Sequence, residues 1–344
     1  MPSHHLITVG IGNLVPTDAR TPVEPIISVW QEIESVFANY RVEARAYDQS
    51  KTAEYLVTLD ASEVLQDLRF FAEYDGSETQ LEYLHAKASS LEEKRPHVTL
   101  KFELTPTNQA ALDCPHTPYR LVSLLLQEIF AVANLCYPGA CNFFRTTYPE
   151  KADVSPPAMY FFYFEDCARF ARDGGWPTYQ TLSFATAWRW LLACGVHDLD
   201  LAKTSAQRAI FTLFMLARLD GFNLAEVLLT SQALEGLLVR KDERIQGTLA
   251  RRLKRIIGVP RDEQNWVKAF YDLRSRVVHG NYPIVREEST SHELNEEVHQ
   301  YHQSYFVPLV RAVAALLAVL QDMIVHQSRE YRFEQNEEMF REPI

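Results

Sequence analysis

In the first part of the chain, hydrophobic and polar residues alternate in short runs. The runs at 55–59 and 97–104 have a period of two, which predicts half-buried strands, and the run at 5–9 predicts another short strand. From 119 to 136 the apolar residues recur at helical spacing instead. The aromatic run at 158–164 predicts a further buried strand. This part of the chain is therefore expected to mix strands with helix.

After Gly174 and Gly175 the pattern becomes helical almost throughout. Apolar residues at helical spacing, closed by glycine, asparagine or proline, predict helices over 182–194, 205–219, 224–239, 243–257, 262–279 and 291–326. Pro308 is expected to kink the last of these or to start a second helix.

The chain has 344 residues, enough for about two domains. The pattern predicts an α+β protein with a mixed N-terminal domain over 1–175, whose function we leave open as sensory or regulatory. An all-α helical bundle follows over 176–326, and a frayed polar tail over 327–344. With 47% hydrophobic and 23% charged residues, the composition excludes a disordered chain and a coiled-coil rod.

Cysteine content and hydropathy bear on the compartment. The five cysteines have no C-x-x-C spacing, which argues against a disulfide framework and a zinc knuckle. Residues 1–5 carry no charged or apolar leader. The longest apolar run, 306–320, is shorter than the ~20 residues of a membrane span. We expect a cytoplasmic protein with no membrane contact and a buried helix at 306–320.

Charge is unevenly distributed along the chain. The net charge is −11, which excludes nucleic-acid binding by bulk electrostatics. From Val239 to Arg276, however, eleven residues are basic and five are acidic. Such a segment could bind a polyanion locally, or it could be a solvated helix face with cations near a helix C-terminus.

Within that segment Arg274 and His279 form an R-x-x-x-x-H motif. The apolar residues Trp266, Phe270 and Leu273 would hold their helix in a core. A spacing of five residues places the two side chains about 140° apart around a helix, so they do not stack. Because His279 precedes a glycine at the predicted helix end, a long arginine and a terminal histidine could still converge on one anion. The alternatives are a surface salt bridge for Arg274 and a histidine stabilised by the helix dipole.

Two segments, one of which contains this motif, resemble a known family. Residues 232–238, with an embedded glutamate, and residues 270–280, with the motif, resemble the HEPN superfamily and within it the Apea-like branch of prokaryotic defence proteins. Residues 249–257 are similar to its connecting helix, and 182–192 look like a flanking element of that branch.

The resemblance implies a helical bundle, usually a dimer, with metal-independent endoribonuclease activity and no cofactor. Arg274 and His279 match its catalytic pair, and Ser275 matches a polar position beside it. Asn281 stands where one variant of the family carries a tyrosine. We add Glu235 as a residue that could hold Arg274 in place. The expected RNA-binding residues are Arg251, Arg252, Lys254, Arg255 and Arg276.

The chemistry suits these residue types. In RNA cleavage without metal the 2′-hydroxyl attacks the phosphate, and a histidine near its usual pKa can take or give the proton. A guanidinium can bind the negative charge of the transition state. A two-fold dimer would supply the second histidine, so a second copy of the chain is an expected partner beside RNA.

Two functions follow from this interpretation. The first is an RNA-cleaving toxin or abortive-infection effector in antiviral defence, restrained by an N-terminal domain that takes a phage-derived or regulatory ligand. The alternative is a non-catalytic dimerisation or RNA-binding scaffold. A metal site at Glu296, His299 and His302 is a weaker alternative to an exposed helix face, so no metal is expected. Gly10 and Gly12 lack the third glycine of a dinucleotide loop.

Overall fold

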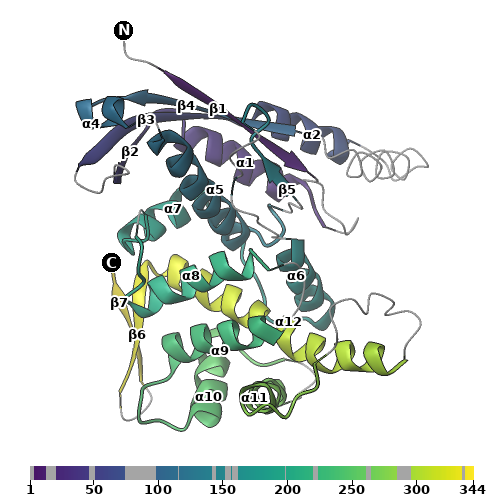
Figure 1. The fold of residues 1–344 in the computed structure, drawn as a ribbon. Helices are drawn as coiled ribbons and strands as arrows, with labels where there is room; N and C mark the ends of the chain where they lie inside the picture. The colour runs from purple at the N-terminus through teal and green to yellow at the C-terminus, as the bar shows by residue number, and fades with distance from the viewer. Residues whose placement is uncertain are drawn as a thin grey trace. The chain divides into compact units, whose positions relative to one another are not determined.

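The computed structural model describes residues 4–12, 21–45, 51–73, 98–114, 116–141, 145–151, 156, 162–197, 199–219, 224–260, 265–284, 296–334 and 338–344. Its architecture is α+β, as predicted: an antiparallel sheet region precedes a mostly helical region (Figure 1). The chain divides into two compact units. Unit 1 comprises residues 1–165 and 181–201, and unit 2 comprises 166–180 and 202–344.

Unit 1 is built on a five-stranded antiparallel sheet in the order β2-β3-β4-β1-β5. Its strands are β1 His5–Gly12, β2 Tyr40–Arg45, β3 Thr52–Asp60, β4 Val98–Pro106 and β5 Arg145–Thr147. The predicted strands at 5–9, 55–59 and 97–104 are confirmed as β1, β3 and β4. In β3 and β4 every second residue is buried, because successive side chains of a strand point to opposite faces.

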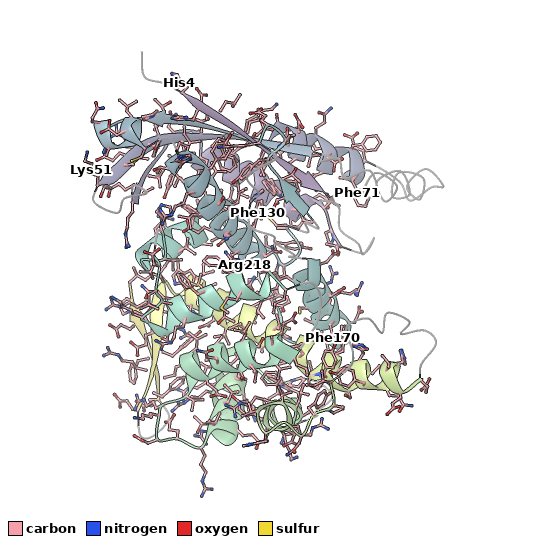
Figure 2. The ribbon with its side chains drawn as sticks, in the orientation of Figure 1. His4, Lys51, Phe71, Phe130, Phe170 and Arg218 are labelled. Atoms are coloured by element: carbon pink, nitrogen blue, oxygen red, sulfur yellow. The ribbon has the colours of Figure 1, made fainter. Side chains whose placement is uncertain are left out.

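Helices pack on this sheet and complete the core of unit 1. They are α1 Glu24–Val36, α2 Ser62–Ala72, α4 Gln109–Asp113, α5 Thr117–Cys136 and α7 Phe184–Ala193. The fully buried Trp30 of α1 donates to the carbonyl of Ala140. Its ring centre lies 6.4 Å from that of Phe130 of α5, which is labelled in Figure 2. The predicted helix at 119–136 is confirmed as α5.

The strand predicted over 158–164 is wrong in the part that the structure describes. Residues from Phe162 onward belong to α6, Phe162–Gly174. Residues 158–161 lie outside the described part of the chain. A short aromatic run carries too few positions to separate a period of two from one of 3.6, and the polar and apolar residues after Phe164 set the helical period.

Unit 2 consists of helices and one hairpin. Its helices are most of α6, from Asp166 onward, and α8 Ser205–Leu216, α9 Leu224–Leu238, α10 Ile245–Ile257, α11 Trp266–Val278 and α12 Glu296–Val325. Pro308 lies inside α12, so this helix is continuous rather than divided. From Leu309 to Leu320 every residue of α12 but Arg311 is buried, as a central core helix requires.

The chain crosses between the units three times, whereas one boundary at 175/176 was expected. Residues 166–180 belong to unit 2 because they bond to its helices. The Tyr179 hydroxyl donates to Ala314 O at 3.1 Å, and the Gln321 side chain bonds both backbone groups of Gln180 at 2.9 Å. The Arg311 guanidinium lies 5.5 Å from the ring centre of Phe170, which Figure 2 marks.

The polar tail at 327–344 is not frayed in its described residues, which corrects that prediction. It forms the hairpin of β6, Ser328–Phe333, and β7, Met339–Pro343. Asp322 of α12 holds it: its carboxylate accepts from the Tyr331 hydroxyl at 2.7 Å and from two Arg341 nitrogens at 3.0 Å. The hairpin therefore belongs to the folded core of unit 2.

Two helices, α5 and α12, are long and apolar enough to cross a membrane by length and composition. Among the described residues, 78% of the most apolar window of each of these helices is buried inside the protein. The helix expected at 306–320 is present and is buried from Leu309 onward except at Arg311, whereas Phe306, Val307 and Pro308 are not buried. The cytoplasmic location stays a prediction.

Candidate functional site

Helix α11 positions the predicted catalytic pair. The side chain of Asn265 caps it by accepting from Lys268 N at 3.1 Å, and Trp266, Phe270 and Leu273 form its buried face as predicted. The helix ends at His279, where Gly280 has a φ of +69° and Asn281 N donates to Arg276 O at 2.8 Å. Gly280 thus acts as the expected helix terminator.

Arg274 faces α9 through Glu235, as predicted. Its Nε lies 3.9 Å from Glu235 Oε1, and Tyr271 donates to the same oxygen at 2.8 Å. Burial and the neighbouring carboxylate raise the pKa of Tyr271, so its hydroxyl stays a donor. Among the described residues, the buried Nε of Arg274 has no hydrogen-bond acceptor.

A cavity of about 550 Å³ opens beside this pair, here called the Arg274 cavity. Its charged side chains are four cations and one anion: Arg208, Arg240, Lys241, Arg274 and Glu235. Three of the cations belong to the basic segment of the sequence, whereas Arg208 was missed there because α8 brings it in from outside that segment. An excess of cations around a cavity favours an anionic ligand.

His279 does not line the Arg274 cavity. It is exposed at the end of α11, and its backbone N–H donates to Ser275 O at 3.0 Å. Ser275 and Asn281 are exposed on the same part of the chain. In the part of unit 2 that the structure describes, no hydrogen bond or ion pair joins Arg274 to His279. A single chain therefore places the two groups near one helix end without joining them.

Arg276 lies on an aromatic cluster beside His279. Its guanidinium carbon is 4.9 Å from the ring centre of Tyr282, which stands 5.3 Å from that of Tyr301. The hydroxyl groups of Tyr282 and Ser304 are 2.5 Å apart. These contacts fix Arg276 on the exposed side of α11, where a phosphate could reach it.

The structure separates Arg252 from the other predicted RNA-binding residues. Arg252 is only 2% exposed, and its guanidinium bonds Glu243 and the carbonyl of Leu238. It also lies 3.9 Å from the ring centre of Phe333. Arg252 is thus a structural residue and does not reach the surface. Arg251, Lys254 and Arg255 are exposed on α10, where they can contact a ligand.

The alternative metal site gains no support from the geometry. His302 Nδ1 is 2.8 Å from the Tyr305 hydroxyl, and His299 Nε2 is 2.8 Å from the Gln303 amide nitrogen. Within the described ranges, no three histidine, cysteine, aspartate or glutamate residues are placed to hold a metal. Glu296 and His299 are exposed, as on the helix face that the sequence also allowed, whereas His302 is half-buried with a buried Nε2.

Comparisons with protein-family models, with curated proteins and with solved structures return no match for this chain. The resemblance to the HEPN superfamily therefore stays a prediction that rests on the residues of the sequence.

Proposed function

We propose that unit 2 binds RNA and cleaves it without a metal, with Arg274 binding the scissile phosphate and His279 transferring a proton. The observation that supports this proposal is the environment of the Arg274 side chain. Its guanidinium lines a cation-rich cavity and keeps a buried Nε without an acceptor in the described structure. A planar guanidinium with free donors matches a phosphate in charge and shape.

Glu235 keeps Arg274 oriented without neutralising it by a close ion pair. The gap of 3.9 Å between Arg274 Nε and Glu235 Oε1 is longer than a hydrogen bond, and Tyr271 already occupies that oxygen. A phosphate that enters the cavity can therefore form charge-assisted hydrogen bonds that Glu235 leaves open. This arrangement supports a positioning role for Glu235 and Tyr271.

His279 suits proton transfer because it is exposed at the C-terminal end of α11, the helix that carries Arg274. In-line attack by the 2′-hydroxyl needs a base on one side of the phosphorus and an acid on the other. One chain offers one such histidine, so we propose a homodimer that places two α11 ends opposite each other. Sedimentation should then give about twice the chain mass of 39.6 kDa.

The biological role we propose is that of a toxin or abortive-infection effector in prokaryotic antiviral defence. Unit 1 would restrain or trigger cleavage by binding a phage-derived or regulatory ligand. Expression of the active chain should slow the growth of its host, because uncontrolled RNA cleavage is toxic.

A non-catalytic RNA-binding or dimerisation scaffold is the second candidate. The observation that favours it is that His279 lies outside the cavity that Arg274 lines. Both candidates require RNA to bind near Arg274, and only the first requires His279.

The deciding experiment incubates the full chain with total tRNA and mRNA in EDTA. Cleavage should leave 2′,3′-cyclic phosphate ends, and His279→Ala should lower the rate by about 10²- to 10⁴-fold. Arg274→Ala should lower it by about 10²- to 10³-fold, and the double variant should be little worse than either single variant. His299→Ala, which changes another exposed histidine of unit 2, is the matched control.

Two results would contradict this proposal. RNA binding with no cleavage would leave the scaffold as the function. Loss of cleavage in EDTA, together with 3′-hydroxyl ends and an effect of His299→Ala, would point to a metal on α12 instead.

A further inference from the structure

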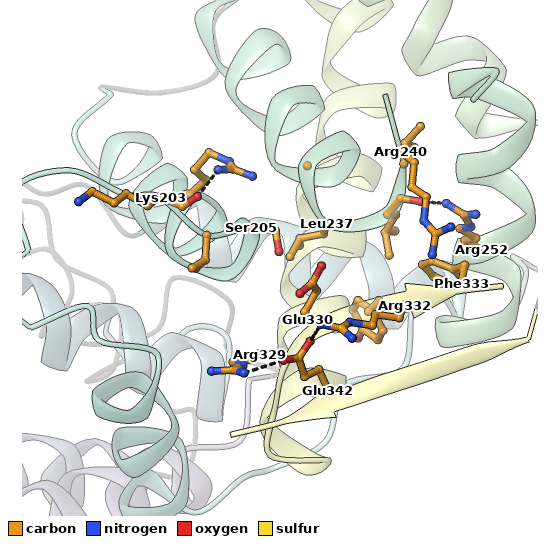
Figure 3. A pocket seen from close by; sticks show the side chains of 16 residues that line it. Lys203, Ser205, Leu237, Arg240, Arg252, Arg329, Glu330, Arg332, Phe333 and Glu342 are labelled. Carbon is orange, nitrogen blue, oxygen red and sulfur yellow. Dashed lines mark hydrogen bonds and ion pairs between the residues drawn. The ribbon is translucent and has the colours of Figure 1, made fainter. Parts of the chain in front are cut away.

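A second cavity of about 450 Å³ lies between the start of α8 and the terminal hairpin, and we call it the hairpin cavity (Figure 3). Its basic side chains come from four separate segments of unit 2: Lys203, Arg208, Arg240, Arg252, Arg329 and Arg332. Its acidic side chains are Glu330 and Glu342. None of the residues proposed for catalysis lines it.

The ion pairs of this cavity leave an excess of positive charge. Arg252 is neutralised by Glu243. Glu342 bonds both Arg329 and Arg332, so one carboxylate is shared by two guanidinium groups. Lys203, Arg208 and Arg240 form no ion pair with a described carboxylate; Arg208 donates only to the carbonyl of Lys203, at 2.7 Å. The other acidic side chain of the cavity, Glu330, is exposed and lies between Ser205 and the hairpin in Figure 3.

The N-terminus of α8 adds to this positive field. Thr204 and Ser205, at the start of the helix, both line the cavity. Thr204 and Gln207 form a capping box, in which each side chain accepts from the other residue's backbone N–H. The first N–H groups of a helix have no partner within the helix and point out of its N-terminus. A helix start of this kind attracts phosphate groups.

We propose that the hairpin cavity binds the phosphate groups of a small ligand of the nucleoside di- or triphosphate class. Several cations converge there with a helix N-terminus, and the volume is that of a small-molecule site. Glu342 pairs with both Arg329 and Arg332 and so holds the two guanidinium groups at the cavity, where Arg332 can donate to a phosphate. Arg208 and Arg240 line both this cavity and the Arg274 cavity, so the two cavities adjoin, but neither Arg274 nor His279 lines the hairpin cavity.

The test is titration calorimetry of the full chain with pyrophosphate and with ATP. Each should bind with a stoichiometry of one per chain. Arg332→Ala and Lys203→Ala should each weaken binding by about tenfold, the effect of removing one hydrogen bond to a charged group. Glu330→Gln should tighten binding, because it removes one of the two negative charges that line the cavity and keeps Glu342, which pairs with Arg329 and Arg332. The matched control is Arg218→Ala, which changes an exposed cation just after the other end of α8 (Figure 2).

The outcomes separate this proposal from its rivals. An unchanged affinity in Arg332→Ala and Glu330→Gln, or an equal loss in Arg218→Ala, would overturn it. Binding of a short single-stranded RNA that depends on Arg332, with no binding of pyrophosphate or ATP, would also overturn it and assign the cavity to the RNA strand. Arg274→Ala should leave pyrophosphate binding unchanged, so failure of the ribonuclease proposal can be told apart from failure of this one.

Discussion

Arg252 and Glu243 form a two-point ion pair: Nη1 and Nη2 of Arg252 each lie 2.7 Å from a different Glu243 oxygen. The pair joins α10 to the loop before it, and the same guanidinium covers the ring of Phe333 in the hairpin. One buried cation therefore ties together three segments of unit 2. Arg252 therefore belongs to the core of unit 2 and not to a ligand-binding surface, although it lies in the basic segment of the sequence.

We expect Arg252→Ala to destabilise unit 2 by about 3 kcal/mol, because it breaks a largely buried ion pair and uncovers Phe333. Lys254→Ala, two residues later and exposed, should change the free energy of unfolding by less than about 0.5 kcal/mol. Urea denaturation of the two variants measures the difference. Equal stabilities would show that the pair contributes little.

The same pair predicts how stability depends on pH. The hydrogen bonds from Arg252, more than any other contact, lower the pKa of Glu243 from its ordinary value of 4.5. The folded pKa lies below the unfolded one, so the pair's stabilisation is present above about pH 4.5 and is lost as the pH falls through the folded pKa. Glu243→Gln should therefore be less stable than the native chain at pH 7, and the gap should narrow toward pH 3.

Urea denaturation at several pH values between 7 and 3 checks that prediction. Asp242→Asn, at the neighbouring exposed position, is the control and should follow the native chain throughout. A gap that stays constant with pH would show that the stabilisation from Glu243 does not depend on its charge.

Local pattern predicted much of the fold. Strands β3 and β4 follow from strict alternation, and α11 follows from its apolar stripe and its terminal glycine. The hairpin could not be predicted in this way, because five of the eleven residues of its two strands are charged and no clear alternation results. Its stability comes from Asp322, which is distant in the sequence from Arg341, and no local period reports such a contact.

The candidate site was predictable in part. The pairing of Arg274 with Glu235 was expected and is present, whereas the contribution of Arg208 depends on how α8 packs beside α9. The burial of Arg252 was predictable from the spacing of apolar residues around it, although a count of charges does not reveal it. Arg252 stands between Leu249 and Leu253 at helical spacing, which places it on the buried face of α10.

Tyr271 should control how freely Arg274 binds a phosphate. In Tyr271→Phe the Glu235 carboxylate loses its 2.8 Å donor and can close on Arg274, so RNA affinity should fall by about fivefold, the scale of one exposed ion pair. Adding Glu235→Gln should restore the affinity, because an amide cannot neutralise the guanidinium. Fluorescence anisotropy with a labelled RNA oligonucleotide measures both. A decrease that Glu235→Gln does not rescue would mean that Tyr271 acts only through packing.

The exposed cations of α10 should set the salt dependence of RNA binding. Arg251, Lys254 and Arg255 can each neutralise a backbone phosphate and release a counterion, so the affinity should fall steeply between about 50 and 200 mM salt. Reversing Lys254 and Arg255 to glutamate should lower the slope of log affinity against log salt by about 0.7 for each phosphate that is no longer neutralised. Arg218→Glu, which makes the same kind of change beyond α8, should leave the slope unaltered. If the α10 variant keeps the native slope, the RNA does not run along α10, and the Arg274 cavity would have to bind it without help from these residues.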